Sequence, residues 1–328
     1  MRRPALLSLA VAVSACIAHA GPAWTDAEKA AKEHPGFELQ GEYVGTMKHQ
    51  DGEAKVGLHV IALGNGKFRA VGYPGGLPGD GWNQEEKITA EGVAKDGVVV
   101  FSGDEGTARL AKGTITIYPP ESDEAVGTLK KVHRESPTLG AMPPKGAVVL
   151  YAGPDDVENW KGGKADEAGH LQQGVTSNET FGDHTLHVEF LIPYQPEDKG
   201  QGRGNSGLYV QGRYEVQMLD SFGLEGKHNE CGGSYSVKDP DVNMAFPPLS
   251  WQTYDVEYTA AKFEGDKMVS APRVTVKHNG VVVHKDVELP GNRSTTAAPS
   301  KPGPEPGPVY LQNHGNPVRY RNIWAVRK

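Results

Sequence analysis

The sequence predicts an all-β protein of two domains, and three of its properties indicate this fold class. The 328 residues include 42 glycines and 24 prolines, more than a helical protein tolerates and typical of short strands joined by turns. β-rich runs recur along most of the chain, and Asn65-Gly66 and Asn279-Gly280 lie between pairs of them as two-residue hairpin turns. The length is sufficient for two ordinary domains.

Residues 1–20 have the pattern of a targeting segment. Arg2-Arg3 gives a positive start, and the apolar run over residues 6–17 is too short to span a bilayer. Two processing sites compete: an A-x-A site at residues 18–20, and a lipobox-like sequence that ends at Cys16, which would then be lipidated and retained. Both predict export without a transmembrane segment. The product is periplasmic or secreted in the first case and an envelope lipoprotein in the second.

The first domain is predicted to be a small all-β domain over residues 37–135. A short segment before it, residues 24–34, is rich in Ala, Lys and Glu and predicts one helix. Glycines bound the β-rich runs that follow. These runs cover residues 42–47, 56–61, 67–71, 98–101, 113–118 and 125–132. Residues 136–146 contain three prolines and predict a linker.

The second domain, residues 147–328, is predicted to be a β-sandwich. Residues 185–192 alternate between polar and apolar side chains, the pattern of a strand with one buried face. Further short strands are expected at residues 147–151, 207–211, 214–219, 254–259, 273–277 and 281–283. Regularly spaced short strands with few helices favour two packed sheets. Cys231 is the one cysteine outside the targeting segment, so no intrachain disulfide is expected.

The charge pattern argues against nucleic acid as a partner. The formal net charge is -7, and the chain has no basic block or interleaved stripe of aromatic residues. Proteins that bind nucleic acid usually gather Lys and Arg on one face. We therefore expect a different partner, which the motifs of the second domain indicate.

Two stretches of the second domain resemble a known family. They are GNSGLYVQGRYEVQMLDS at residues 204–221 and VYLQNHGNPVRYRNIW at residues 309–324. With both motifs in order, residues 146–327 are similar to the 3-keto-disaccharide hydrolase domain. The resemblance implies a concanavalin-like double-sheet β-sandwich, or jelly roll. It also implies an oligosaccharide or glycoside substrate already oxidised at C3, cleaved by hydrolysis or by elimination followed by hydration of a 3-keto-2-hydroxy-glucal.

A 3-keto sugar can be cleaved without the paired carboxylates of an ordinary glycosidase. The ketone acidifies the proton on C2, so a base can form an enediolate that expels the substituent on C1. Such a site needs a base with a pKa near neutral and donors or a cation at O3. A divalent metal chelated by O2 and O3 would stabilise the enediolate, so a metal cofactor is possible.

Strand alternation and the family motifs together select the candidate site residues. Glu215 and Gln217 share one face of the strand predicted over residues 214–220. Gln312 and His314 likewise share a face near the end of a second strand. On spacing alone, Glu215 and Gln217 could lie on a solvated outer face, and His314 could lie in a surface turn. The family motifs favour a sugar-binding face instead.

The catalytic candidates are His314 for proton transfer, Glu215 as a base or metal ligand, and Arg213 as a donor to the oxyanion. The candidates for substrate binding are Asn205, Gln217, Gln312 and His228, the last of these in a loop expected to overhang the sheet. Two other functions fit the same fold. A sandwich of this kind can bind carbohydrate without cleaving it, or serve in adhesion at the envelope.

Overall fold

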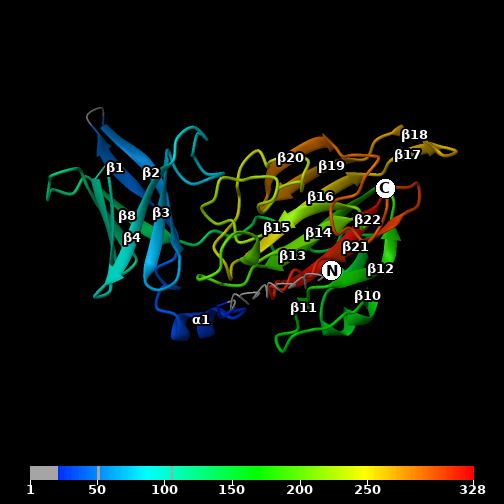
Figure 1. Ribbon diagram of the computed structural model, residues 1–328, viewed down its shortest axis with the longest axis horizontal. Coiled ribbons are helices and arrows are strands. Elements are labelled where there is room, and N and C mark those ends of the chain that lie inside the picture. The colour runs from blue at the N-terminus through cyan, green and yellow to red at the C-terminus, as the bar shows by residue number, and fades with distance from the viewer. Residues whose placement is uncertain (1–20, 50–51, 105) are drawn as a thin grey trace, which may run out of the picture.

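The computed structural model describes residues 21–49, 52–104 and 106–328. The predicted targeting segment, with Cys16, lies outside the described residues. Figure 1 shows two β bodies side by side, the first built by the N-terminal part of the chain and the second by the remainder. In the part that the structure describes, no helix is both long and apolar enough to cross a membrane.

The first body is a closed antiparallel barrel of eight strands, in which each strand pairs with the next and β8 pairs with β1. Its strands are β1 (Gly41–His49), β2 (Gly52–Ala62), β3 (Lys67–Pro74), β4 (Ile88–Lys95), β5 (Val98–Gly103), β6 (Gly106–Ala111), β7 (Thr114–Tyr118) and β8 (Gly127–Val132). Buried side chains such as Tyr43, Phe68 and Phe101 fill its interior. The predicted β domain is thus a barrel, and closure leaves no exposed sheet edge.

Two barrel strands, β4 and β6, were not among the strands predicted from the sequence. Their sequences, ITAEGVAK and GTARLA, are rich in Ala, Gly and charged residues, which are depleted in strands. Pairing with neighbours on both sides overrides this weak local preference.

Helix α1 (Ala27–Glu33) is shorter than the predicted helix because both ends are set by local chemistry. At the start, the Asp26 side chain accepts a hydrogen bond from the backbone N–H of Lys29 at 2.7 Å, as an N-cap does. At the end, His34 is extended, as expected of a residue before proline. The preceding Trp24 forms a β-bridge with Tyr194 of the second body, so this segment contacts both bodies.

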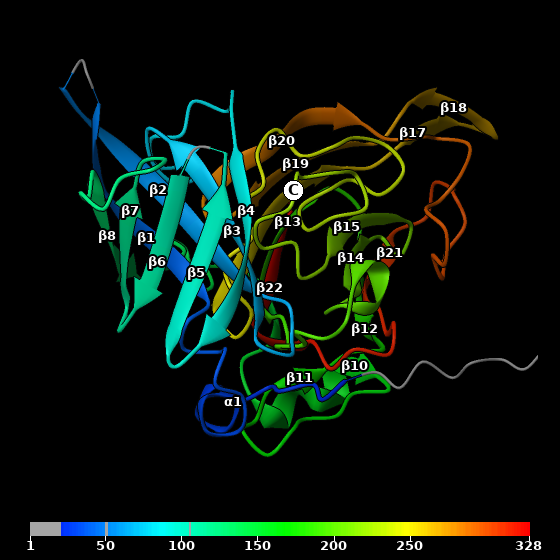
Figure 2. The same cartoon turned by 60° about the vertical axis from the view of Figure 1, so that its left-hand side comes forward.

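The second body is the predicted β-sandwich, in which a five-stranded and a seven-stranded antiparallel sheet pack together (Figure 2). The five-stranded sheet has the order β10 (Trp160–Lys161), β12 (Val175–Phe181), β21 (Gly307–Leu311), β14 (Ser206–Val210) and β15 (Tyr214–Met218). The seven-stranded sheet has the order β11 (Leu171–Gln172), β22 (Arg319–Arg327), β13 (His184–Leu191), β16 (Trp251–Thr259), β19 (Arg273–His278) and β20 (Val281–Glu288), with β9 (Val148–Tyr151) beside β22.

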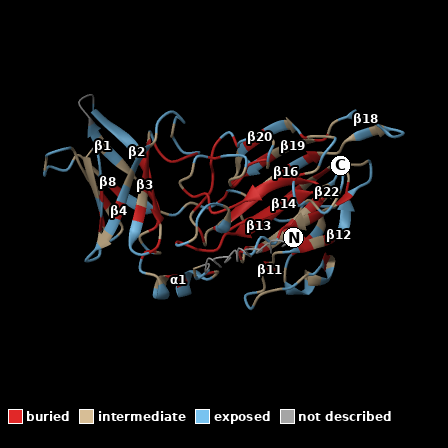
Figure 3. Ribbon diagram, viewed as in Figure 1, coloured by how far each residue is buried: buried red, intermediate tan, exposed pale blue. Residues whose placement is uncertain are grey.

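Apolar side chains from both sheets form one core, and Figure 3 shows β13, β14 and β16 largely buried. Burying such surface is the main favourable contribution to folding. The remaining elements are the 3-10 helices η1 (Pro154–Asn159) and η2 (Gly200–Gly202) and the hairpin of β17 (Lys262–Glu264) with β18 (Lys267–Ser270).

The linker predicted over residues 136–146 lies against the seven-stranded sheet. The Ser136 hydroxyl is 2.6 Å from that of Thr253, and the Thr138 hydroxyl donates to Asp255 at 2.7 Å. The Gly140 N–H donates to the Glu189 carboxylate at 2.6 Å. Because these bonds fix the segment to the sandwich, the linker does not behave as a free tether.

Candidate functional site

The outer face of the five-stranded sheet brings polar side chains from three strands together. In the register of β14 with β15, Gly207 is opposite Gln217 and Tyr209 is opposite Glu215. In the register of β14 with β21, Tyr209 is opposite Tyr310. Because side chains alternate along a strand, these residues share the outer face while their sequence neighbours enter the core.

Glu215 is a carboxyl group on this face, carried by the edge strand β15, and only 4% of the residue is exposed. The absence of a side chain at Gly207 makes room for it, since a Cβ there would lie 2.2 Å from Glu215 Oε1. The Tyr209 hydroxyl donates to Glu215 Oε2 at 2.8 Å. Burial raises the pKa of Glu215 to about 7, and the Tyr209 hydrogen bond acts in the opposite direction. A carboxyl group with this pKa can accept and return a proton near neutral pH.

Gln312 extends the polar row on the far side of Tyr209. The backbone N–H of Gln312 donates to Gly207 O at 2.9 Å, which continues the pairing beyond the end of β21. Its side-chain Nε2 donates to the Tyr209 hydroxyl oxygen at 3.2 Å, so Tyr209 connects Gln312 to Glu215. Gln312 Oε1 is buried and has no hydrogen-bond partner. Such an orphaned acceptor is uncommon in proteins.

Gln201 connects the two other polar side chains of the row. Its Oε1 accepts from Gln217 Nε2 and from Asn205 Nδ2, each at 3.1 Å. Asn205 Oδ1 is buried and has no partner, like the amide oxygen of Gln312. Sequence reasoning missed Gln201, because it lies in the glycine-rich turn η2, where no strand alternation assigns it a face. It also missed Tyr209, which the alternation of β14 could have identified.

Arg213, the predicted oxyanion donor, holds a loop segment next to β15. Its Nε donates to Lys301 O at 2.7 Å, and its Nη1 donates to Gln211 Oε1 at 2.6 Å. The same segment contacts the strand again, because the Glu215 N–H donates to the Thr295 hydroxyl at 3.2 Å. The segment 295–301 therefore contributes to the burial of Glu215.

Both candidate histidines lie on exposed loops. β21 ends at Leu311, so the alternation expected to place His314 beside Gln312 does not continue to it. His314 is exposed in the following bend, and none of the side chains in the described part of the chain makes a hydrogen bond with it. His228 is also exposed, and its Nδ1 accepts a hydrogen bond from the Ser236 N–H at 3.2 Å.

The structure thus separates the predicted site residues into two groups. Glu215, Gln217, Gln312 and Asn205 converge on one face of the sheet, whereas Arg213, His228 and His314 belong to the surrounding loops. Over the described ranges, no group of three or more His, Cys, Asp or Glu side chains is arranged to hold a metal ion.

Comparison with known proteins relates this face to a family. The family model for the 3-keto-alpha-glucoside-1,2-lyase-like domain matches residues 146–326, which is the sandwich up to the penultimate residue of β22. None of the curated proteins matches the chain.

Solved structures of two proteins from Parabacteroides distasonis, each named “putative glycosyl hydrolase”, are similar to the sandwich. The first is 32% identical with a TM-score of 0.50 and aligns over 56% of this chain and 85% of its own. The second is 16% identical with a TM-score of 0.39 and aligns over 56% of this chain and 99% of its own. Because the family model covers more than half of the chain, the protein belongs to the 3-keto-alpha-glucoside-1,2-lyase-like family and is a carbohydrate-active enzyme.

Proposed function

We propose that this protein cleaves glycosides whose glycosyl unit carries a ketone at C3. The observation that carries the proposal is Glu215, a buried carboxyl group with a pKa of about 7 on a face otherwise lined by amide and hydroxyl groups. An unoxidised glycoside would need a second carboxyl group facing the first. A 3-keto glycoside needs one base of near-neutral pKa, which Glu215 supplies.

In the proposed mechanism, Glu215 removes the proton on C2 and the electron pair forms an enediolate with O3. The enediolate restores the ketone as the bond from C1 to the leaving group breaks, which leaves a double bond between C1 and C2. Water then adds its hydroxyl to C1, and the Glu215 carboxyl group, whose proton exchanges with solvent, donates a proton to C2. Glu215 is therefore regenerated, and the net reaction is hydrolysis.

Other residues are proposed to bind the sugar and to move the second proton. The amide groups of Asn205, Gln217 and Gln312 can donate to and accept from sugar hydroxyls and O3. His314, two residues after Gln312, is proposed as the acid that protonates the leaving group and then recovers a proton from the water that adds to C1. His228 is proposed to contact the sugar from the loop after β15, and Arg213 to support catalysis by holding the segment 295–301 in place.

The experiment that tests this function compares a 3-keto glucoside with the same unoxidised glucoside. We expect cleavage of the first and no cleavage of the second, because without the ketone the C2 proton is too weakly acidic for a carboxylate base. In deuterated water, hydrogen at C2 should exchange during cleavage. Equal turnover of both compounds would identify a paired-carboxylate glycosidase instead. Binding of both without turnover would identify a carbohydrate-binding or adhesion protein.

We further propose that the protein is exported, on the basis of residues 1–20 of the sequence. Mass spectrometry of protein from the native host should find either a terminus at Gly21 or a lipid-modified Cys16. Cys16→Ser decides between the two, because it releases the protein from the membrane only if Cys16 carries the lipid. Recovery of the chain with Met1 intact in the cytoplasm would refute export.

A further inference from the structure

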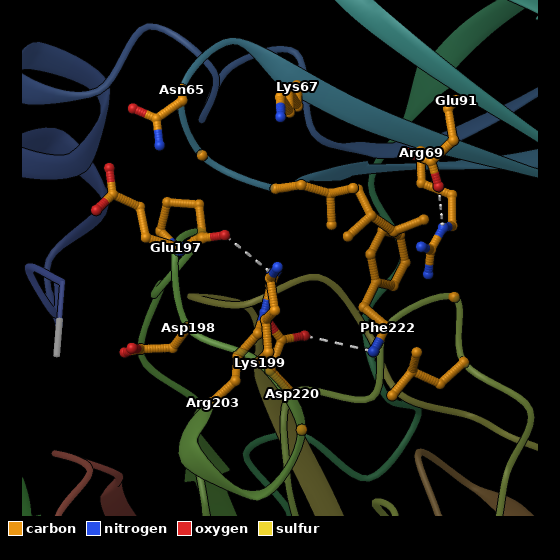
Figure 4. A pocket seen from close by; sticks show the side chains of 17 residues that line it. Asn65, Lys67, Arg69, Glu91, Glu197, Asp198, Lys199, Arg203, Asp220 and Phe222 are labelled. Carbon is orange, nitrogen blue, oxygen red and sulfur yellow. Dashed lines mark hydrogen bonds and ion pairs between the residues drawn. The ribbon is translucent and has the colours of Figure 1, made fainter. Parts of the chain in front are cut away.

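A cavity of about 570 Å³ lies between the barrel and the sandwich (Figure 4). The hairpin of β2 and β3 forms one wall with Asn65 and Lys67, and the segment 196–200 of the sandwich forms the other. Arg203 and Phe222 lie between these walls. Clefts at domain interfaces are common ligand sites, so the chemistry of the lining decides what this one can hold.

Arg203 is the residue of this cavity whose hydrogen bonds are incomplete. Only 7% of the residue is exposed. Its Nε donates to Asp220 at 2.5 Å, and its Nη1 donates to the carbonyl oxygens of Ala62 and Pro196 at 3.2 and 3.3 Å. Nη2 is buried and has no acceptor in the described structure. Because buried donors are nearly always satisfied, an unpaired one beside a cavity is unusual.

The remaining lining favours a neutral ligand with many hydroxyl groups. Four basic and four acidic side chains line the cavity, so their charges balance and a strongly anionic ligand gains no net attraction. Amide and carboxylate groups supply donors and acceptors, while Ile61, Leu63 and Leu224 supply apolar surface. A sugar presents hydroxyl groups at its edge and C–H groups on its faces, which matches this mixture.

The segment 200–203 contributes both to the cavity and to the outer face of the five-stranded sheet, on which Glu215 lies. Gly200 and Arg203 line the cavity, and between them Gln201 binds Gln217 and Asn205 on the sheet. Asp220, also in the lining, is five residues after Glu215, and five extended residues span at most about 18 Å. An oligosaccharide can cover even this upper limit.

We infer that the interdomain cavity binds neutral sugar units on the leaving-group side of the glycoside, with the exposed Asn65 and Lys67 side chains as hydrogen-bond donors. The inference rests on the proposed function for the cleaved unit, but the binding itself needs no turnover. It gives the barrel a role in selecting oligosaccharides over simple glycosides.

The binding is tested by titration calorimetry of the full chain with maltotriose and cellotriose, which are unoxidised and therefore not cleaved. Arg203 also makes structural bonds, so the test variant is Asn65→Gly with Lys67→Ala, on the exposed hairpin. Glycine suits position 65 because Asn65 has a φ of 53°. Loss of two hydrogen bonds should weaken binding about tenfold. The matched control is Asp96→Gly with Lys130→Ala, which changes a turn residue with a φ of 52° and a lysine elsewhere on the barrel.

The control should bind as the wild type does. Kinetics add a second measurement. The test variant should have a higher KM than the wild type for maltotriose oxidised at C3 of its terminal unit. Its KM for methyl 3-keto-glucoside should equal that of the wild type. Failure of both trisaccharides to bind, or equal binding by the test variant, would overturn the inference. The inference would also be overturned if Glu215→Gln lost trisaccharide binding while the test variant kept it. Binding of inorganic phosphate without binding of either trisaccharide would overturn it as well. A protein that binds trisaccharide in the cavity but turns nothing over would refute only the proposed function.

Discussion

Replacing Glu215 by Gln is expected to lower the turnover of a 3-keto glucoside by about a hundredfold or more, the usual effect of losing a general base. The amide has the shape of the carboxyl group but cannot accept the C2 proton. Single-turnover kinetics with the purified variant provide the measurement. Glu264→Gln, which removes an exposed carboxylate from the hairpin β17–β18, is the matched control and should leave turnover unchanged.

The pH dependence of the wild type should report the same residue. Since the base must be ionised, turnover should rise with pH through a midpoint near 7, the pKa of Glu215. Tyr209→Phe removes the hydrogen bond that lowers this pKa, so the midpoint should move to higher pH. A midpoint that stays at the wild-type value in Tyr209→Phe would show that another group limits the rate.

Stability separates loss of function from loss of fold in the Glu215→Gln variant. Burial raises the pKa of Glu215 from 4.5 to about 7, so its ionised form destabilises the fold. This cost is absent below about pH 4.5 and complete above about pH 7, where the shift corresponds to about 3 kcal/mol. The variant should therefore be at least as stable as the wild type at pH 8. Near-normal turnover in a folded Glu215→Gln would refute the assignment of the base.

Replacing Arg134 by Ala should destabilise the protein by about 3 kcal/mol or more, the usual result of breaking a buried ion pair. Arg134 Nε and Nη2 donate to the two oxygens of Glu42 at 2.9 and 2.6 Å, and His59 Nε2 lies 3.2 Å from the same carboxylate. Glu42 is buried, so in the variant His59 is the one remaining side-chain partner described for its carboxylate. Thermal or urea unfolding of the full chain provides the measurement.

The comparison with Arg69→Ala isolates the effect of burial. Arg69 pairs with Glu91 at 2.9 Å on the exposed surface of the barrel, and its loss should cost less than about 1 kcal/mol. Hydrogen bonds from Arg134 and His59 hold the pKa of Glu42 at about 2, below its usual value of 4.5 despite burial. The stabilisation is therefore present above pH 4.5 and is lost as pH falls towards 2. Equal destabilisation by both variants, or a difference that does not shrink in acid, would contradict this account.

The local sequence determined those features that depend on neighbours along the chain. Glycine and proline content with short β-rich runs predicted the all-β class. Alternation placed Glu215 and Gln217 on one face, because side-chain direction in a strand repeats every two residues. The same local rule failed at His314, since the strand ends at Leu311. Strands β4 and β6 were likewise not predicted, because their residues have a low propensity for strands.

Only the tertiary structure decided which distant residues meet. β21 pairs with β14 across about a hundred residues of chain, and this pairing brings Gln312 to Tyr209 and Glu215. Burial raises the pKa of Glu215, and no sequence pattern carries that information. Closure of β1 on β8 and the contact of Phe222 with His59 across the domains have the same origin. A pKa and a binding cleft depend on what surrounds a group in space, whereas periodicity reports only which way a side chain points.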